Sequence, residues 1–128
     1  MDERSEHCLE GVHPDLARIV RAAAKISATP FIVIHGLRNV AEERANVAKG
    51  ASTTMHSRHL PNAAGLACAV DVAAEADGHI SWEPALYGHV AQAMKQAARV
   101  LDLPVEWGGD WHSLKDYGHF QLPWASYP

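Results

Sequence analysis

Apolar residues recur at helical spacing in two stretches of the chain, residues 14–26 and residues 84–101. The longer stretch has an apolar face made of Leu86, Val90, Met94, Ala97 and Leu101. The shorter one has an apolar face made of Leu16, Ile19, Val20 and Ala23. Side chains at this spacing lie along one side of an α-helix, where they cover a core. Pro14 suits the first turn of the shorter helix, because the N–H that proline lacks has no helical partner there.

A further, shorter helix is predicted over residues 39–50. Asn39 can cap its first turn together with Glu42, which lies three residues later, and Gly50 is suited to end it. Residues 51–65 follow neither a helical nor a strand period, so we expect a loop there.

Runs of apolar residues predict strands over residues 31–35 and 66–74. The pair Asp77-Gly78 predicts a tight turn toward a short second strand. Residues 104–123 predict two short strands around a polar loop. Because helices and strands do not alternate regularly, the predicted fold class is α+β, with a small antiparallel sheet flanked by helices.

The composition is typical of one globular domain over residues 1–128, with 48% apolar and 20% charged residues. The net charge of −4 argues against partners such as nucleic acid or an anionic membrane surface. No apolar run is long enough to span a bilayer, and the charged amino terminus lacks the apolar segment of a Sec signal. We therefore expect synthesis and folding in a cytosol. Cys8 and Cys68 lie in dissimilar surroundings and are not expected to form a disulfide.

Asp71 is the single charged residue in an apolar strand, within the sequence AVDVAA. A buried carboxylate is tolerated when it is paired or binds a metal ion. The loop before this strand contains His56 and His59, and the chain as a whole contains nine histidines. The sequence therefore predicts a partner for Asp71 among these histidines, and a metal ion is a candidate.

Four residues have the chemistry of a catalytic zinc site: His59, Asp71, Asp116 and His119. Such a site has three nitrogen or oxygen ligands and leaves a fourth position to water, whose pKa falls to about 7. Two imidazoles and one carboxylate provide this set, and a further carboxylate three residues before His119 can act as a general base. Each residue taken alone also fits a plain role, as a loop or strand histidine, a hydrogen-bonded aspartate or a solvated turn residue.

Several motifs in order resemble a known family. These are GLR, KGASTTMHSRHL, AVDVAA and WGGDWHSLKDYGHFQL, and the similarity extends over nearly the whole chain. They resemble the zinc D-Ala-D-Ala metallopeptidases, and within them the phage endolysins that are L-alanyl-D-glutamate endopeptidases, related to the vancomycin-resistance D,D-dipeptidases. The resemblance implies the zinc DD-peptidase (Hedgehog-like) fold and cleavage of the peptidoglycan stem peptide for host lysis.

The resemblance also implies roles for individual residues. The Ser-x-His motif falls on Ser57 and His59, and the zinc ligands fall on His59, Asp71 and His119. Asp116 corresponds to the catalytic acid of the later motif. Arg38 corresponds to the arginine that stabilises developing negative charge or grips the substrate, although a structural salt bridge with Glu42 fits Arg38 nearly as well.

Eleven residues separate His59 from Asp71, five more than in the family's motif. We interpret the sequence Pro-Asn-Ala-Ala-Gly as a loop insertion, which loop entropy tolerates at small cost. The alternative is that His56 or Cys68 replaces one of the expected ligands, although Cys68 also fits the role of a small buried apolar residue.

The remaining candidates have weaker signals. His56 and His112 are expected at the rim of the cleft. Trp107 and Trp111 can form its floor or belong to the core, and Asp110 can orient a ligand or cap a turn. Surface, capping or core roles are expected for the histidines without ligand spacing, which are His7, His13, His35, His79 and His89.

Two alternative functions remain open beside the endopeptidase. One is a D,D-carboxypeptidase or dipeptidase of the same fold, and the other is a non-catalytic zinc module that binds the wall. Asp116 favours catalysis, because a binding module has no use for a general base. We expect a monomer that is made in the host bacterial cytoplasm and reaches the wall after a separate protein permeabilises the membrane.

Overall fold

The structure is a computed structural model that describes residues 1–38 and 57–128. The described elements are, in order, α1 (Glu3–Leu9), α2 (Pro14–Ile26), β1 (Phe31–His35), β2 (Ala69–Ala76), β3 (His79–Ser81), α4 (Pro84–Leu101), β4 (Glu106–Trp107), the 3-10 helix η1 (Gly108–Asp110) and β5 (His119–Gln121). The predicted α+β class is confirmed. The helix predicted over residues 39–50 lies outside the described residues.

Both long helices have the predicted bounds, Pro14–Ile26 and Pro84–Leu101. The α2 helix begins after His13, whose side chain accepts a hydrogen bond from the Asp15 N–H at 3.1 Å. The capping role that we considered for His13 is therefore confirmed. No helix in the described part of the chain is long and apolar enough to cross a membrane.

The α1 helix was not predicted from the sequence. Of its seven residues, only Ser5 and Leu9 are buried, so the helix has almost no apolar face. Asp2 caps the first turn by accepting a hydrogen bond from the Ser5 N–H at 2.7 Å. The buried Ser5 hydroxyl accepts a hydrogen bond from the Val33 N–H at 3.0 Å, which ties α1 to β1.

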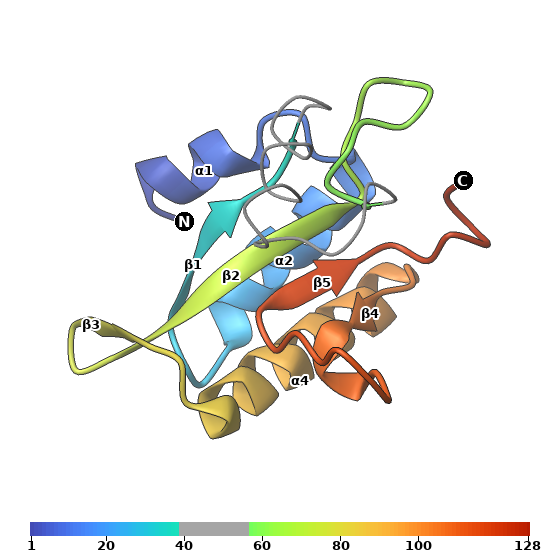
Figure 1. Cartoon of the computed structure of the whole chain (residues 1–128). Coiled ribbons are helices and arrows are strands. Elements are labelled where there is room, and N and C mark those ends of the chain that lie inside the picture. Colours follow the sequence, from blue (N-terminus) through green and yellow to red (C-terminus); the bar gives the residue numbers. More distant parts are fainter. Residues whose placement is uncertain (39–56) are drawn as a thin grey trace, which may run out of the picture.

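The described strands form one antiparallel sheet with the order β1-β2-β5-β4, and β3 pairs with β2. The predicted turn between β2 and β3 is confirmed, since Asp77 and Gly78 have φ values of 53° and 79°. Positive φ at both central residues matches the twist of a tight hairpin. Figure 1 shows the long strand β2 between β1 and β5, so its side chains can meet side chains from both neighbours.

The two faces of the sheet differ in chemistry. Figure 1 shows α2 and α4 on one side of it, and the buried core against these helices includes Val70, Val72 and Phe120. Successive side chains of a strand point to opposite faces. Asp71 and His119 therefore lie on the face away from these two helices, where polar groups can gather without disturbing the core.

Candidate active site

Three predicted ligands come together on the polar face of the sheet. The His59 Nε2 atom lies 3.2 Å from one oxygen of Asp71, and the His119 Nδ1 atom lies 3.2 Å from the other. The ligand atoms of the three residues lie within 4.8 Å of one another, so the group could hold a metal ion. Asp71 thus has the histidine partners that its position in an apolar strand required.

Strand pairing and one loop position these residues. Asp71 on β2 is the direct register partner of His119 on β5, which places their side chains on the same face. His59 comes from the loop before β2. Its N–H donates to the Ser57 hydroxyl at 3.1 Å, and its carbonyl oxygen accepts from the Arg38 N–H at 2.7 Å. Ser57 therefore shapes the turn that presents His59.

The second nitrogen of each histidine also has a partner. The His59 Nδ1 atom lies 2.9 Å from the Gly36 carbonyl oxygen, and the His119 Nε2 atom lies 2.7 Å from the Gln121 side-chain oxygen. His59 and His119 are only 4% and 7% exposed. Acceptors of this kind fix the tautomer and orientation of metal-binding imidazoles. The sequence analysis missed Gln121, although its position two residues after His119 places it on the same strand face.

Asp71 and His119 shift each other's pKa values. Burial alone would raise the pKa of the Asp71 carboxyl, but hydrogen bonds from His119, His35 and His59 outweigh burial and lower it well below its usual range. Burial would lower the pKa of His119, but the adjacent Asp71 raises it. Asp71 is therefore ionised and ready to bind a cation.

Asp116 lies beside this group in a pocket of about 420 Å³ that Asp71 also lines. Partial burial and the negative charge of Asp71 raise the pKa of the Asp116 carboxyl above its usual value. The loop that carries Asp116 is held by Gly108, whose carbonyl oxygen accepts the Asp116 N–H at 3.2 Å. A carboxylate with a raised pKa in a cleft is suited to take up and release a proton.

Arg38 directly follows the segment that closes β1, and its backbone N–H bonds the carbonyl oxygen of His59. The residue is partly buried. Glu42, the alternative salt-bridge partner, lies outside the described residues. The catalytic role of Arg38 stays a prediction.

Residues 61–65, which we interpret as an insertion, form a small loop whose two ends are joined by hydrogen bonds. Asn62 holds it, because its backbone N–H donates to the Leu66 carbonyl oxygen at 2.9 Å and its side-chain oxygen accepts the Leu66 N–H at 3.0 Å. Gly65 has a φ of 81°, which favours glycine. Residues 61–65 therefore form a compact turn between His59 and Asp71.

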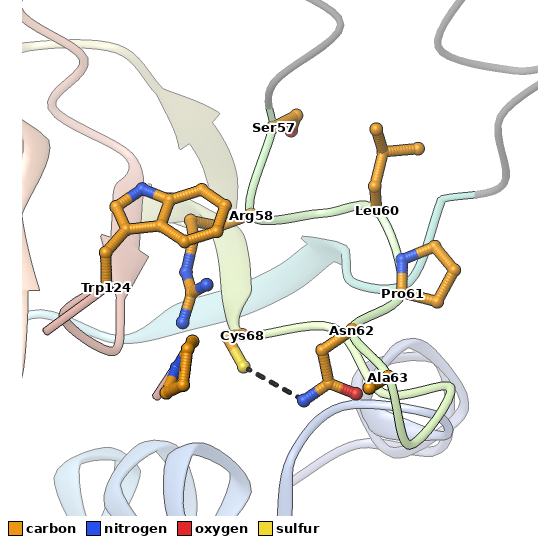
Figure 2. A pocket seen from close by; sticks show the side chains of 9 residues that line it. Ser57, Arg58, Leu60, Pro61, Asn62, Ala63, Cys68 and Trp124 are labelled. Atoms are coloured by element: carbon orange, nitrogen blue, oxygen red, sulfur yellow. Dashed lines mark hydrogen bonds between the residues drawn. The ribbon is translucent and has the colours of Figure 1, made fainter. Parts of the chain in front are cut away.

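Cys68 does not join the ligand group within the described part of the chain. Figure 2 shows its thiol beside the Asn62 side chain. The Asn62 Nδ2 atom lies 3.8 Å from the Cys68 Sγ atom, and both residues line a separate pocket of about 300 Å³. Arg58 and Trp124 also line this pocket, with the guanidinium 3.8 Å from the centre of the indole ring. Burial raises the pKa of the Cys68 thiol, so Cys68 fits the role of a buried apolar residue. His56, the other alternative ligand, lies outside the described residues.

The two tryptophans of the last motif have different surroundings. The Trp107 ring is stacked 6.4 Å from Phe120 and packs against the core. The Trp111 ring lies 5.2 Å from the His119 ring and thus next to the ligand group. Of the two roles considered, Trp107 has the core role and Trp111 borders the site.

Neither Asp110 nor His35 belongs to the group of ligand atoms. The Asp110 carboxylate lies 2.6 Å from the Lys95 ammonium on α4, so it pairs with a residue outside that group. His35, which has no ligand spacing in the sequence, has its Nδ1 atom 3.5 Å from the Asp71 carboxylate. Pairing between distant strands brings His35 there, and local spacing does not contain that information.

The chain is similar in sequence and structure to peptidases over most of its length. A family described as "Phage L-alanyl-D-glutamate peptidase" matches residues 1–121. The L-alanyl-D-glutamate peptidase of Escherichia phage T5 is 30% identical over 98% of this chain and 90% of its own length. The peptidase of the same name from Listeria phage A118 is 30% identical over 75% of this chain and 31% of its own length. The crystal structure of the Serratia marcescens L-Ala D-Glu endopeptidase ChiX matches with a TM-score of 0.90 and 46% identity, covering 100% of this chain and 92% of that one.

Proposed function

Because the chain belongs to the phage L-alanyl-D-glutamate peptidase family, we propose that it is a metal-dependent endopeptidase that cleaves the L-Ala–D-Glu bond of the peptidoglycan stem peptide. The observation that carries this proposal is the group of His59, Asp71 and His119 ligand atoms, whose Asp71 lines the same pocket as Asp116. A ligand group beside a carboxylate of raised pKa is suited to hydrolysis of an amide bond.

We assign zinc to this group, with His59, Asp71 and His119 as its ligands. Two imidazole nitrogens and one carboxylate oxygen are a typical donor set of catalytic zinc. The fit is supported by the outer contacts, since the far nitrogen of each imidazole is held by an acceptor, Gly36 or Gln121. When bound there, zinc supplies Lewis acidity, which polarises a carbonyl group and lowers the pKa of water.

Asp116 is assigned as the group that moves the proton. Its carboxylate takes a proton from the attacking water and donates it to the leaving amine of D-glutamate. The raised pKa of Asp116 supports this role, because a carboxyl group that holds its proton more tightly is a better base. Arg38 is assigned to the negative charge that develops on the scissile carbonyl oxygen, since a guanidinium stays charged and binds oxyanions.

The enzyme acts on the bacterial cell wall in this proposal, as a monomer. Its synthesis is assigned to the host cytoplasm, with access to the wall after a separate protein has permeabilised the membrane. The substrate is the stem peptide, and the proposal includes no nucleic-acid partner.

The test is mass spectrometry of purified peptidoglycan digested by the protein with and without a chelator. Cleavage at the proposed bond yields fragments with a new amino terminus at D-glutamate. The chelator should abolish them, and added zinc should restore them.

Two other outcomes would contradict the proposal. Release of terminal D-alanine would indicate a D,D-carboxypeptidase. No hydrolysis of any wall peptide by the zinc-loaded protein would indicate a binding module.

A further inference from the structure

An irregularity in β1 determines which side chain lies opposite Asp71. The pairing between β1 and β2 joins Val33 to Val72 and then joins His35 to Asp71, so the register shifts between Val33 and His35. In regular pairing the residue opposite Asp71 would be Ile34. A β-bulge of this kind adds one residue to a strand and redirects the side chain that follows. Here it replaces an isoleucine with a histidine beside the carboxylate.

The geometry separates His35 from the ligand histidines. Its Nδ1 atom lies 3.5 Å from the same Asp71 oxygen that lies 3.2 Å from His59 Nε2. The His35 side chain is 59% exposed, whereas the His59 and His119 side chains are 5% and 9% exposed. The group of ligand atoms within 4.8 Å of one another does not include His35. His35 therefore contacts the carboxylate from outside the ligand group.

Of the three proposed ligands, only Asp71 still needs a hydrogen-bond partner outside the ligand group. The far nitrogens of His59 and His119 already have acceptors in Gly36 and Gln121. The near nitrogens of the same two histidines contact Asp71, and these nitrogens would be the metal donors of the proposed site. Of the side chains placed against Asp71 in the described ranges, His35 is the one that remains as its partner in that state.

We propose that His35 is a positioning residue for the metal site: it donates its Nδ1–H to the Asp71 carboxylate and holds it in the orientation that binds zinc. This inference rests on the proposed metal site. Carboxylates that bind metal ions are themselves commonly hydrogen-bonded, and loss of such an outer partner typically weakens metal affinity about 10- to 100-fold. The bulge in β1 is then the feature of the backbone that supplies this partner.

The experiment measures zinc affinity by competition with a chromophoric chelator, for the full chain and three variants at His35. His35→Ala should weaken zinc binding by about 10- to 100-fold while keeping about one site per chain. His35→Asn places an amide donor close to the position of Nδ1 and should recover most of the affinity. His35→Gln reaches toward the position of Nε2 and should not. His79→Ala, at an exposed histidine on β3, is the matched control and should bind like the wild type.

Equal affinity in His35→Ala and the wild type would overturn the inference, as would an asparagine variant no better than the glutamine variant. Loss of the site itself in His35→Ala, with the metal-free fold intact by circular dichroism, would make His35 a ligand and also overturn it. If the wild type binds no zinc, both this inference and the proposed metal site fail. If the wild type binds zinc and the His35 variants bind it with the same affinity, the inference about His35 fails and the proposed metal site stands.

Discussion

The Asp71 carboxylate lies among His35, His59 and His119, so its oxygens have polar partners before any metal ion binds. Removing His59 or His119 therefore deprives the site of a metal donor and of a partner for a carboxylate whose side chain is 20% exposed. The Asp116 side chain has a different position, because it borders the group without belonging to it. Substitutions at these two kinds of position should separate metal binding from catalysis.

We expect His59→Ala and His119→Ala each to reduce the zinc content from about one ion per chain to a small fraction, because two ligands hold zinc poorly. Elemental analysis of protein purified with zinc in the buffer measures this. His7→Ala, at an exposed histidine of α1, is the control and should keep its zinc. Full occupancy in either site variant would remove that histidine from the ligand set.

Asp116→Asn should keep the fold and the zinc content, because Asp116 is not assigned as a ligand. Its amide cannot accept a proton, so the rate of peptidoglycan hydrolysis should fall by at least about a hundredfold. Asp110→Asn, which changes a carboxylate paired with Lys95, is the matched control and should hydrolyse at nearly the wild-type rate. Equal rates for Asp116→Asn and the wild type at equal zinc content would refute the proposed mechanism.

The pH dependence of the wild type tests the same carboxylate. Partial burial raises the pKa of Asp116 above the usual carboxyl value of about 3.9. Catalysis needs the ionised form, so activity should be lost as the pH falls through this raised value. The rate should be measured from neutral to acidic pH with zinc content followed in parallel, since protonation of the histidines also releases metal. If the loss of activity at acidic pH is fully explained by the loss of zinc, Asp116 is not the base.

At the scale of elements, the spacing of apolar residues along the chain predicted the two long helices and the first strand. The ranges of α2, α4 and β1 were predicted because their apolar spacing or composition is continuous. The α1 helix was missed because seven residues, mostly polar, give too short a pattern. The ligand set followed from residue chemistry and family resemblance, and the structure brings those ligand atoms together. The contact of His35 could not be predicted, because regular pairing would place Ile34 opposite Asp71.

The 3-10 helix η1 and the loop that carries Asp116 are packed too closely for a side chain at Gly108. An added Cβ atom there would overlap the Asp116 carbonyl oxygen. Gly108→Ala should therefore displace the Asp116 loop and lower the hydrolysis rate. Zinc affinity should fall less, because His59 and Asp71 lie on other segments and His119 is held in β5 by its pairing with β2. Gly88→Ala, in α4 with open space around it, is the control and should be tolerated. A fully active Gly108→Ala variant would show that the position of this loop is unimportant.

At the scale of the whole molecule, the two faces of the sheet have different roles. The helix side supplies the apolar core, and the other side holds a charged group whose protonation is linked to folding. The lowered pKa of Asp71 stabilises the metal-free fold above its unfolded value, near 4. The raised pKa of His119 stabilises it below the unfolded value, near 6.5, and this contribution is lost as the pH rises through the raised value.

The difference in stability between the zinc-loaded and metal-free forms should therefore grow as the pH rises. As the pH rises from the unfolded value of about 6.5 through the raised value of His119, the melting temperature of the metal-free protein should fall, because His119 loses its proton. Zinc binds the deprotonated histidines and only the folded chain, so its stabilising effect should grow over the same range. Thermal melts with chelator and with excess zinc measure both. A constant difference between the two forms across this range would contradict the linkage.

The loop that Asn62 closes at its base is a place where the chain length can change between related proteins. A turn whose ends are already joined can gain or lose residues at its tip without moving the strands on which the ligands lie. Each doubling of loop length costs only about 0.6 kcal/mol. Changes of length at residues 63–65 should thus be nearly neutral for selection, and lineages can drift in the spacing between His59 and Asp71 while catalysis is retained.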